Sequence, residues 1–247
     1  MTENSRKPDS SEAGPPPYLH TFRVDERLFE RWRLSRGLKC KKGGYDSGLV
    51  YHHALAELLE ERAPAAFCDI RHHLRKLSIT FYSPFHLNDL SRSSSGRGTR
   101  DIVNAMKFTL AYCTDLPAVR EGDVLSFLTK IRPVSDAADS LLAYDHFDLT
   151  QQLLDDPAQA TVKIFCHHHL KDLLADCGVL VSSDLLSFKQ AFFCEGGIAC
   201  EQPLKNSPSA FMRGQIEVRN VGLLYEKMLN GIGDFQQHGY GMLRMTI

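Results

Sequence analysis

The sequence lacks the features that mark several large classes of protein. No run of apolar residues reaches the roughly 18 that a transmembrane helix needs. The first residues, Met-Thr-Glu-Asn-Ser, contain no apolar run of the kind found in a secretory signal. The seven cysteines are an odd set without a repeated CxxC spacing, which argues against a disulfide framework. With 43% hydrophobic and 24% charged residues, the 247-residue chain is expected to be a globular cytoplasmic protein with reduced thiols.

The two halves of the chain differ in charge, although the net charge is only −1. Residues 18–132 hold 19 Lys and Arg against 13 Asp and Glu, whereas residues 133–247 hold 8 against 14. The positive surplus gathers in residues 23–42 and 71–107. Such a surplus suits a polyanionic partner, although a solvated charged face would have the same composition. Residues 133–162 contain six Asp and no Lys or Arg, so we expect them to face away from nucleic acid or toward a basic protein.

Hydrophobic periodicity predicts an α+β protein built from two halves of similar size. Strands are expected at residues 18–24, 77–82, 124–131, 162–165, 186–194, 211–218 and 242–247. Helices are expected at residues 49–61, 102–112, 170–176 and 221–229, with a helical turn at 27–34. Residues 90–100 are poor in apolar side chains and predict an exposed mobile loop. The domains follow as a disordered tail (1–17), an N-terminal domain with basic insertions (18–132), an acidic linker (133–161) and a C-terminal domain (162–247).

A glycine-rich segment precedes the last predicted strand. It runs Gly231-Ile232-Gly233, then five residues, then Gly239-Tyr240-Gly241-Met242-Leu243-Arg244. A dinucleotide-binding fingerprint needs a strand before the glycines and a helix after them, and here the order is reversed. A Walker lysine is absent as well. Such a loop can expose backbone N–H groups to phosphates, or it can simply form two tight turns.

The stretch from Ala210 to Arg244, AFMRGQIEVRNVGLLYEKMLNGIG…HGYGMLR, resembles the C-terminal end of the CRISPR repeat-RNA processing endoribonucleases. The segment Val124–Pro133 resembles the family's strand that ends in a basic residue and proline. The resemblance implies two tandem ferredoxin-like (RRM-like) βαββαβ domains with a C-terminal glycine-rich loop and an inserted basic loop or helical segment. Family loops usually carry a Lys or Arg between the glycine pairs, whereas this chain has Asp234-Phe-Gln-Gln-His238. That departure suggests a less common subtype, such as the type IV systems.

The resemblance also implies an activity, which is metal-independent and cofactor-free cleavage of precursor CRISPR RNA within the repeat hairpin. The 2′-OH beside the scissile phosphate attacks it, and the enzyme keeps the mature crRNA and joins the effector complex. One alternative is a non-catalytic guide-RNA-binding subunit of that complex. Another is an unrelated α+β protein with a glycine turn.

Catalytic candidates are a histidine near the first helix and several arginines. One positioned histidine can supply general acid–base catalysis, and His52, beside His53 and after Tyr45, is expected to reach a groove. Arginine stabilises a pentavalent phosphate well. The arginine candidates are Arg23, on a strand that the fold places near the glycine-rich loop, Arg36 and Arg244. Ordinary solvated histidines and surface ion pairs are the alternatives.

RNA-binding candidates lie in the basic segments and in the glycine-rich loop. They are Lys39, Lys41, Lys42, Arg71, Arg75, Arg92, Arg97, Arg100, Gly231, Gly233, His238, Gly239, Tyr240 and Gly241. A-form stems are recognised by shape and phosphates, so Arg92, Arg97 and Arg100 are expected to contact the stem. Tyr240 or Phe235 could stack on an unpaired base, although packing on a neighbouring strand is the stronger interpretation for Phe235.

The run Cys166-His167-His168-His169, with Cys177, offers zinc-type ligands. In a strand these histidines would point to alternate faces, and no second clustered pair completes a tetrahedral set. We therefore expect no metal site.

Overall fold

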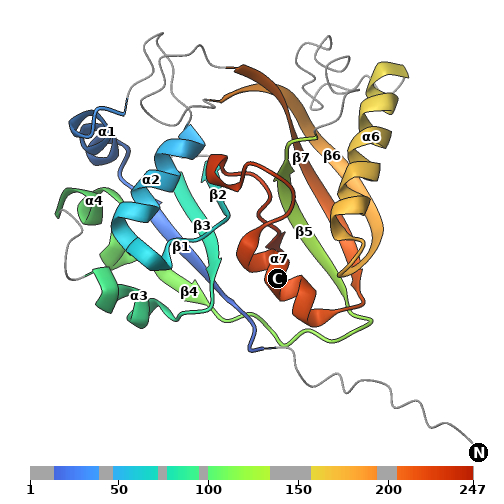
Figure 1. The fold of residues 1–247 in the computed structure, drawn as a ribbon, viewed down its shortest axis with the longest axis horizontal. Coiled ribbons are helices and arrows are strands. Elements are labelled where there is room, and N and C mark those ends of the chain that lie inside the picture. The colour runs from blue at the N-terminus through green and yellow to red at the C-terminus, as the bar shows by residue number, and fades with distance from the viewer. Residues whose placement is uncertain are drawn as a thin grey trace, which may run out of the picture.

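Two four-stranded antiparallel sheets form the protein (Figure 1). The structure is a computed structural model that describes residues 14–38, 47–71, 77–94, 100–133, 157–193 and 205–246. The strand orders are β2-β3-β1-β4 and β6-β7-β5-β8. In each sheet the first and third strands of the domain pair at the centre, which is the ferredoxin-like arrangement. The prediction of an α+β fold with two tandem ferredoxin-like domains is therefore confirmed.

The first domain buries one face of its sheet beneath helices. Its elements are β1 (Tyr18–Val24), α1 (Glu26–Ser35), α2 (Ser47–Leu59), η1 (Glu60–Arg62), β2 (Phe67–Arg71), β3 (Leu77–Ser83), α3 (Leu87–Ser94), α4 (Arg100–Ala105), η2 (Phe108–Leu110) and β4 (Tyr112–Thr114). Asp25 caps α1 by accepting a hydrogen bond from the backbone of Leu28 at 3.2 Å. Alternate residues of the central strands, such as Phe22 and Ile79, pack against fully buried Leu58 of α2. Among the described residues of this domain no helix covers the other face of the sheet, which we call the first open face.

The second domain repeats this plan and covers one side of its sheet with two helices. Its elements are β5 (Val124–Ile131), α6 (Pro157–Leu174), β6 (Gly178–Phe193), β7 (Lys205–Val218), α7 (Val221–Asn230), η3 (Gln236–His238) and β8 (Arg244–Met245). Phe127 of β5 is fully buried with Leu170 of α6 and Leu224 of α7. The side chains of Leu128 and Arg244, which pair across β5 and β8, lie on the opposite side, the second open face.

The position of β5 differs from the expected domain division. Residues 124–131 do form a strand, but it pairs with β7 and β8 rather than with the first sheet. A boundary at residue 132 therefore cuts the second domain, which begins with β5. The expected linker 133–161 lies mostly outside the described residues, and its last five residues already belong to α6. The expected tail is described only from Gly14 onward.

Several local predictions were also wrong. Residues 162–165 are not a strand, because α6 runs through them and buries Val162, Cys166, Leu170 and Leu174, one face at helical spacing. The mobile loop expected at residues 90–100 is helical at 90–94, which belong to α3, and at Arg100, which begins α4, and Leu90 of α3 is fully buried. The helix expected at 102–112 ends at Ala105, since Lys107 adopts a left-handed backbone conformation. The strand β2 was missed altogether.

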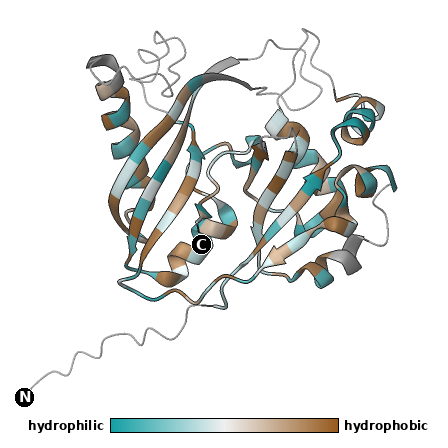
Figure 2. Cartoon of the chain, turned by 180° about the vertical axis from the view of Figure 1, so that it is seen from behind, coloured by the Kyte–Doolittle hydropathy of each residue, from teal (hydrophilic) through white to brown (hydrophobic). Residues whose placement is uncertain are grey.

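The two domains share one apolar core. Ala66 and Tyr82 of the first domain are buried together with Phe127 and Leu224 of the second. The Tyr82 hydroxyl accepts a hydrogen bond from the backbone N–H of Met245 at 3.0 Å. Seen from behind, α7 and the segment that follows it lie between the two sheets (Figure 2). No helix among the described residues is long and apolar enough to cross a membrane.

Candidate functional site

The glycine-rich loop is held by hydrogen bonds within the protein. The N–H of Gly231 donates to Lys227 O at 2.8 Å, that of Gly239 to Gln236 O at 2.9 Å, and that of Gly241 to Lys130 O at 2.7 Å. Gly241 has φ +81°, and a β-carbon there would collide with the carbonyl of Ile232. The expectation that these three glycines present their amides to phosphate is therefore not met in this structure, because the amides already have backbone partners.

The loop packs on α2 and on the start of β2. The Cα of Gly48, at the beginning of α2, lies against the backbone of His238, so that a β-carbon would overlap the His238 carbonyl. Gly239 lies against the ring of Phe67, and Gly231 against Ala66. We expected the glycine-rich loop to lie beside β1. In the structure the loop reaches the edge of the first sheet, and the strand at that edge is β2. This contact brings the C-terminal loop to the histidines of α2.

His52 is a half-buried histidine that faces this contact. Its Nδ1 is buried, and no hydrogen-bond partner for it exists among the described residues. Burial lowers the pKa of His52 below 6.5, and the neighbouring His53 and His238 lower it further. The imidazole is therefore neutral at pH 7 and can accept a proton. His53 is exposed on the same helix.

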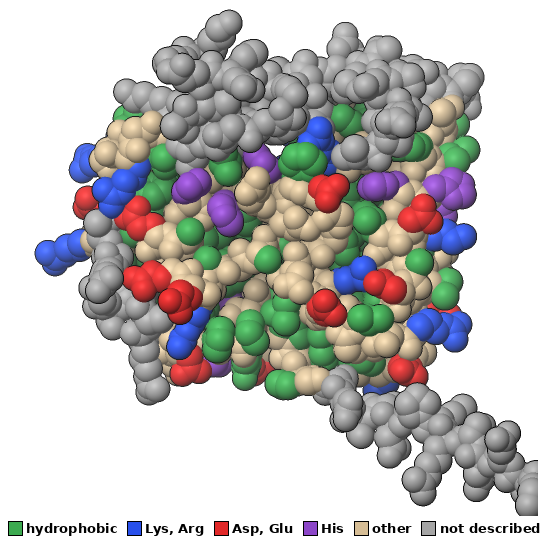
Figure 3. Space-filling view, in the orientation of Figure 1, with side chains coloured by type: hydrophobic (Ala, Val, Ile, Leu, Met, Phe, Trp, Pro, Cys, Tyr) green, Lys and Arg blue, Asp and Glu red, His purple; other side chains and the backbone are tan. Residues whose placement is uncertain are grey.

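His238 comes from the loop and is only 4% exposed. Its Nε2 lies 3.3 Å from the Nε2 of Gln237, and its ring centroid lies 5.6 Å from that of Phe235. Histidine side chains gather near the upper end of α2 in the space-filling view (Figure 3). A site assembled here draws one histidine from each domain.

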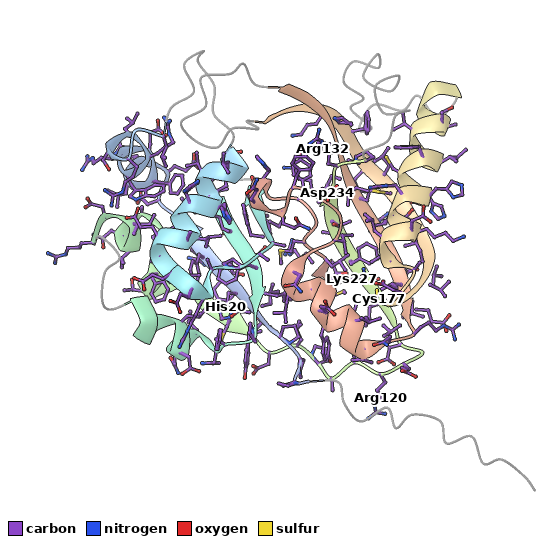
Figure 4. The ribbon with its side chains drawn as sticks, viewed as in Figure 1. His20, Arg120, Arg132, Cys177, Lys227 and Asp234 are labelled. Carbon is purple, nitrogen blue, oxygen red and sulfur yellow. The ribbon has the colours of Figure 1, made fainter. Side chains whose placement is uncertain are left out.

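Two aromatic rings of the loop are covered by cations, one from β5 and one from the residue that follows it. The guanidinium carbon of Arg132 lies 3.8 Å from the Phe235 ring centroid, which agrees with the packing interpretation of Phe235. The ammonium of Lys130 lies 4.3 Å from the Tyr240 ring centroid, and Tyr240 is 5% exposed. Tyr240 therefore has no free face for a stacked base. Figure 4 shows Arg132 beside Asp234 of the same loop.

Cations also lie where the first open face approaches the second domain. Burial raises the pKa of Cys68 to about 11, opposed by the positive charges of Lys130 and Arg244. Burial likewise raises the pKa of Tyr82 to about 12, again opposed by Arg244. Arg244 is therefore close to β2 and β3 as well as to β5. Lys130 was not among the predicted site residues, although the strand ending in a basic residue and proline contained it.

The predicted arginines are not all brought together. Arg23 is exposed on β1, on the first open face, and pairs in register with Ser78. Arg36 lies at the end of α1, where its Nε and Nη2 donate to the two carboxylate oxygens of Glu57 at 2.9 and 2.7 Å. The hydrogen bonds that Arg36 donates to Glu57 raise the pKa of Arg36 above its usual value. This ion pair gives Arg36 a structural role.

Most of the basic RNA-binding candidates fall outside the described parts of the chain. Arg100 is exposed at the start of α4, Arg71 is the last residue of β2, and Arg92 lies within α3. Lys39, Lys41, Lys42, Arg75 and Arg97 lie outside the described residues, as does Tyr45. Their contacts with RNA stay predictions.

The Cys166–His169 run lies in α6 rather than in a strand. His167 Nδ1 is 2.8 Å from the Ser183 hydroxyl, and the His169 ring stacks on Phe165 with centroids 6.4 Å apart. Within the described ranges, no group of three or more His, Cys, Asp or Glu side chains could hold a metal ion.

Comparison with known proteins identifies the architecture. No family model and no curated protein matches the sequence. Among solved structures, the CRISPR endoribonuclease Cse3 bound to a 19-nucleotide RNA is similar over 94% of this chain and 100% of its own, with 15% identity and a TM-score of 0.54. The chain has the fold of the CRISPR endoribonucleases. Thermus thermophilus Cse3 bound to an RNA representing a pre-cleavage complex gives 15% identity and a TM-score of 0.51, over 94% of this chain and 100% of the other.

A chain of a CRISPR RNA-guided surveillance complex, in a pre-nicking state, shares the same fold. It is 14% identical, with a TM-score of 0.50, over 93% of this chain and 99% of its own. The fold implied by the resemblance of residues 210–244 is thus confirmed, since the chain has the same fold as Cse3. The similarity covers more than nine tenths of the chain and therefore extends over both ferredoxin-like domains.

Proposed function

We propose that this protein is an endoribonuclease that cleaves precursor CRISPR RNA within the repeat hairpin, keeps the mature crRNA and joins the effector complex. One observation carries the proposal. The glycine-rich loop of the second domain packs on α2 of the first and places His238 near His52, in a fold shared with Cse3 over nearly the whole chain. The type IV subtype stays a prediction.

The proposed reaction needs no metal ion. Neutral His52 takes the proton of the 2′-OH, whose oxygen then bonds to the adjacent phosphorus. The bond from phosphorus to the 5′ oxygen breaks, and that oxygen takes the proton that the His52 imidazolium now holds, which gives a 2′,3′-cyclic phosphate and a 5′-OH. Arg244 is the proposed cation that stabilises the negative charge of the pentavalent intermediate. Arg23 is not included, because its side chain lies on the first open face, across the sheet from α2. Arg36 is not included, because its guanidinium binds Glu57.

A non-catalytic guide-RNA-binding subunit is the second candidate. It is favoured by the glycine-rich loop, whose Gly231, Gly239 and Gly241 amides bond within the protein instead of facing a phosphate. Such a subunit would hold the same hairpin through its basic segments without cutting it.

A cleavage assay on the cognate repeat RNA in EDTA separates the two. We expect specific cleavage in EDTA that a 2′-deoxy substitution at the cut site abolishes, and a cyclic phosphate on the 5′ product. Tight binding of the hairpin without cleavage would leave the binding subunit as the function. Cleavage that needs a divalent cation would contradict the mechanism.

A further inference from the structure

A groove at the edge of the first open face is separate from the contact between the loop and α2. It has a volume of about 410 Å³ and is lined by Arg23, Val24, Leu77, Ser78, Lys107, Leu110 and Tyr112. Among the described residues that line it, two are cations and none is a carboxylate. Because three apolar side chains and one tyrosine lie beside two positive charges, the groove suits a ligand that is both flat and anionic.

The tyrosine of this groove is exposed although it belongs to a sheet. Tyr112 begins the edge strand β4, pairs in register with Thr21 and is 50% exposed. Residues opposite each other in register point to the same face, so Tyr112 projects from the same side as Thr21 and Arg23. Leu110, in the turn before it, is 57% exposed. A large exposed aromatic next to an exposed leucine is an unusual feature of a polar surface.

The cations are held at the other side of the groove. Arg23 lies two residues beyond Thr21 on β1, which is about 7 Å along the strand. The Lys107 ammonium is anchored 3.4 Å from Asp25 Oδ2, and the left-handed backbone at Lys107 (φ 43°) turns the chain from α4 toward η2. Tyr112 and Arg23 thus lie on neighbouring strands of one face, two residues apart along the strand direction.

We infer that this groove binds a single-stranded RNA segment that flanks the repeat hairpin, with one base stacked on Tyr112 and the adjacent phosphates near Arg23 and Lys107. The inference rests on the proposed function, because it takes as its ligand the single-stranded flank of the repeat hairpin that the protein is proposed to bind. Bases stack on exposed aromatic rings of sheet faces, and the stacking tolerates any sequence. A folded protein partner would favour apolar contacts, whereas the positive charge of Arg23 in this groove suits a phosphate.

The test compares two uncleavable 2′-deoxy RNAs, the bare hairpin and the hairpin with a ten-nucleotide single-stranded flank. For the unsubstituted protein, we expect the flank to tighten binding by about tenfold, the usual size of one stacked base. Tyr112→Ala should abolish that gain and leave affinity for the bare hairpin unchanged, while Tyr112→Phe should keep it. Lys107→Gln should reduce the salt dependence of flanked-RNA binding by about one phosphate contact.

The matched control is Phe85→Ala. Phe85 is also an exposed aromatic (39%) beside an arginine, with the Arg62 guanidinium 4.6 Å from its ring, but it does not line the groove. The inference would be overturned if the flank still tightened binding by the Tyr112→Ala protein. It would also be overturned if Phe85→Ala abolished the tighter binding as completely as Tyr112→Ala does. A 4-thiouridine placed in the flank should crosslink to the peptide that contains Tyr112.

The proposed function and this inference fail in different ways. Failure of the endoribonuclease proposal would appear as no cleavage of the unmodified hairpin. Failure of the inference would appear as cleavage with no contribution from the flank. A labelled single-stranded decamer without any hairpin tests the groove directly, and we expect Tyr112→Ala to weaken its binding about tenfold. Equal binding by both proteins would overturn the inference whatever the cleavage assay shows.

Discussion

Gly48 and His238 touch through their backbones, although 190 positions separate them in the sequence. Neither a side chain nor a water can lie between α2 and the glycine-rich loop at this point. The contact fixes the distance from His52 to the loop, so the geometry of the proposed site depends on a glycine that performs no chemistry.

Replacing Gly48 with alanine should therefore be costly. The added methyl group must push α2 away from the loop, and overpacking of this kind costs about 1–3 kcal/mol. We expect the free energy of unfolding, measured in urea, to fall by that amount. The control is Gly222→Ala in α7, where a β-carbon would meet only Asn220 Oδ1 at 3.5 Å and helix propensity favours alanine. Equal stability of the two variants would contradict the close contact.

His52→Ala should lower the single-turnover cleavage rate about 10²–10⁴-fold if His52 is the general base. The rate of the unsubstituted protein should rise with pH and level off, with a midpoint below 6.5, because burial lowers the pKa of His52 and only the neutral form accepts a proton. His53→Ala, on the same helix but exposed, is the control and should cut at nearly the normal rate. A pH profile that His52→Ala leaves unchanged would assign the base to another group.

Arg244 and Arg213 make a matched pair on the second open face, since both lie in register with Leu128. Arg213 is bonded to Asp184 at 2.8 Å, and both side chains are more than half exposed. Arg244 instead lies near Cys68 and Tyr82. We expect Arg244→Gln to reduce the cleavage rate about 100-fold and Arg213→Gln to leave it nearly unchanged. Similar losses of cleavage rate in both variants would show that the rate depends on the overall positive charge of this face and not on Arg244 itself.

His20 should make the protein sensitive to acid. It is fully buried, with Nε2 3.0 Å from Phe85 O, and burial lowers its pKa from 6.5 to about 4. Between these values the unfolded chain binds a proton that the folded protein does not, so stability falls as the pH drops. The loss should approach about 3 kcal/mol by pH 4. Urea unfolding at pH 7 and 4.5 measures it.

His20→Gln should remove this part of the pH dependence. His168→Gln, which changes an exposed histidine of α6, should retain it. If both variants lose stability on acidification as steeply as the unsubstituted protein, another buried group is responsible.

Local sequence patterns predicted much of the fold. Alternating apolar residues located β1, β3 and β5, helical periodicity located α7, and the glycine spacing located the loop after it. The four-residue spacing of buried side chains in α6 was hidden by β-branched residues and by the histidine run, which favoured a strand. Edge strands such as β4, only three residues long, have too little pattern to be found.

The candidate site was harder to predict, because its parts meet only in the tertiary structure. His52 was identified, but nothing near it in the sequence indicates that His238 is its neighbour. Gly48 offered one signal, since a glycine in the first turn of a helix often marks close backbone contact. Arg36 fitted the chemistry equally well in the sequence, and only its bonds to Glu57 set it apart.

Strand β5 follows β4 in the chain but belongs to the second sheet, and this order matters while the chain is being synthesised. The first sheet is complete once β4 has left the ribosome, whereas β5 follows it with no partner yet made. Its apolar side, with Phe127 and Ile131, has to wait for β7 and β8, and contacts this distant in sequence form slowly. During that interval the nascent chain carries an unpaired strand, the kind of element that chaperones recognise and that aggregates when it is left uncovered.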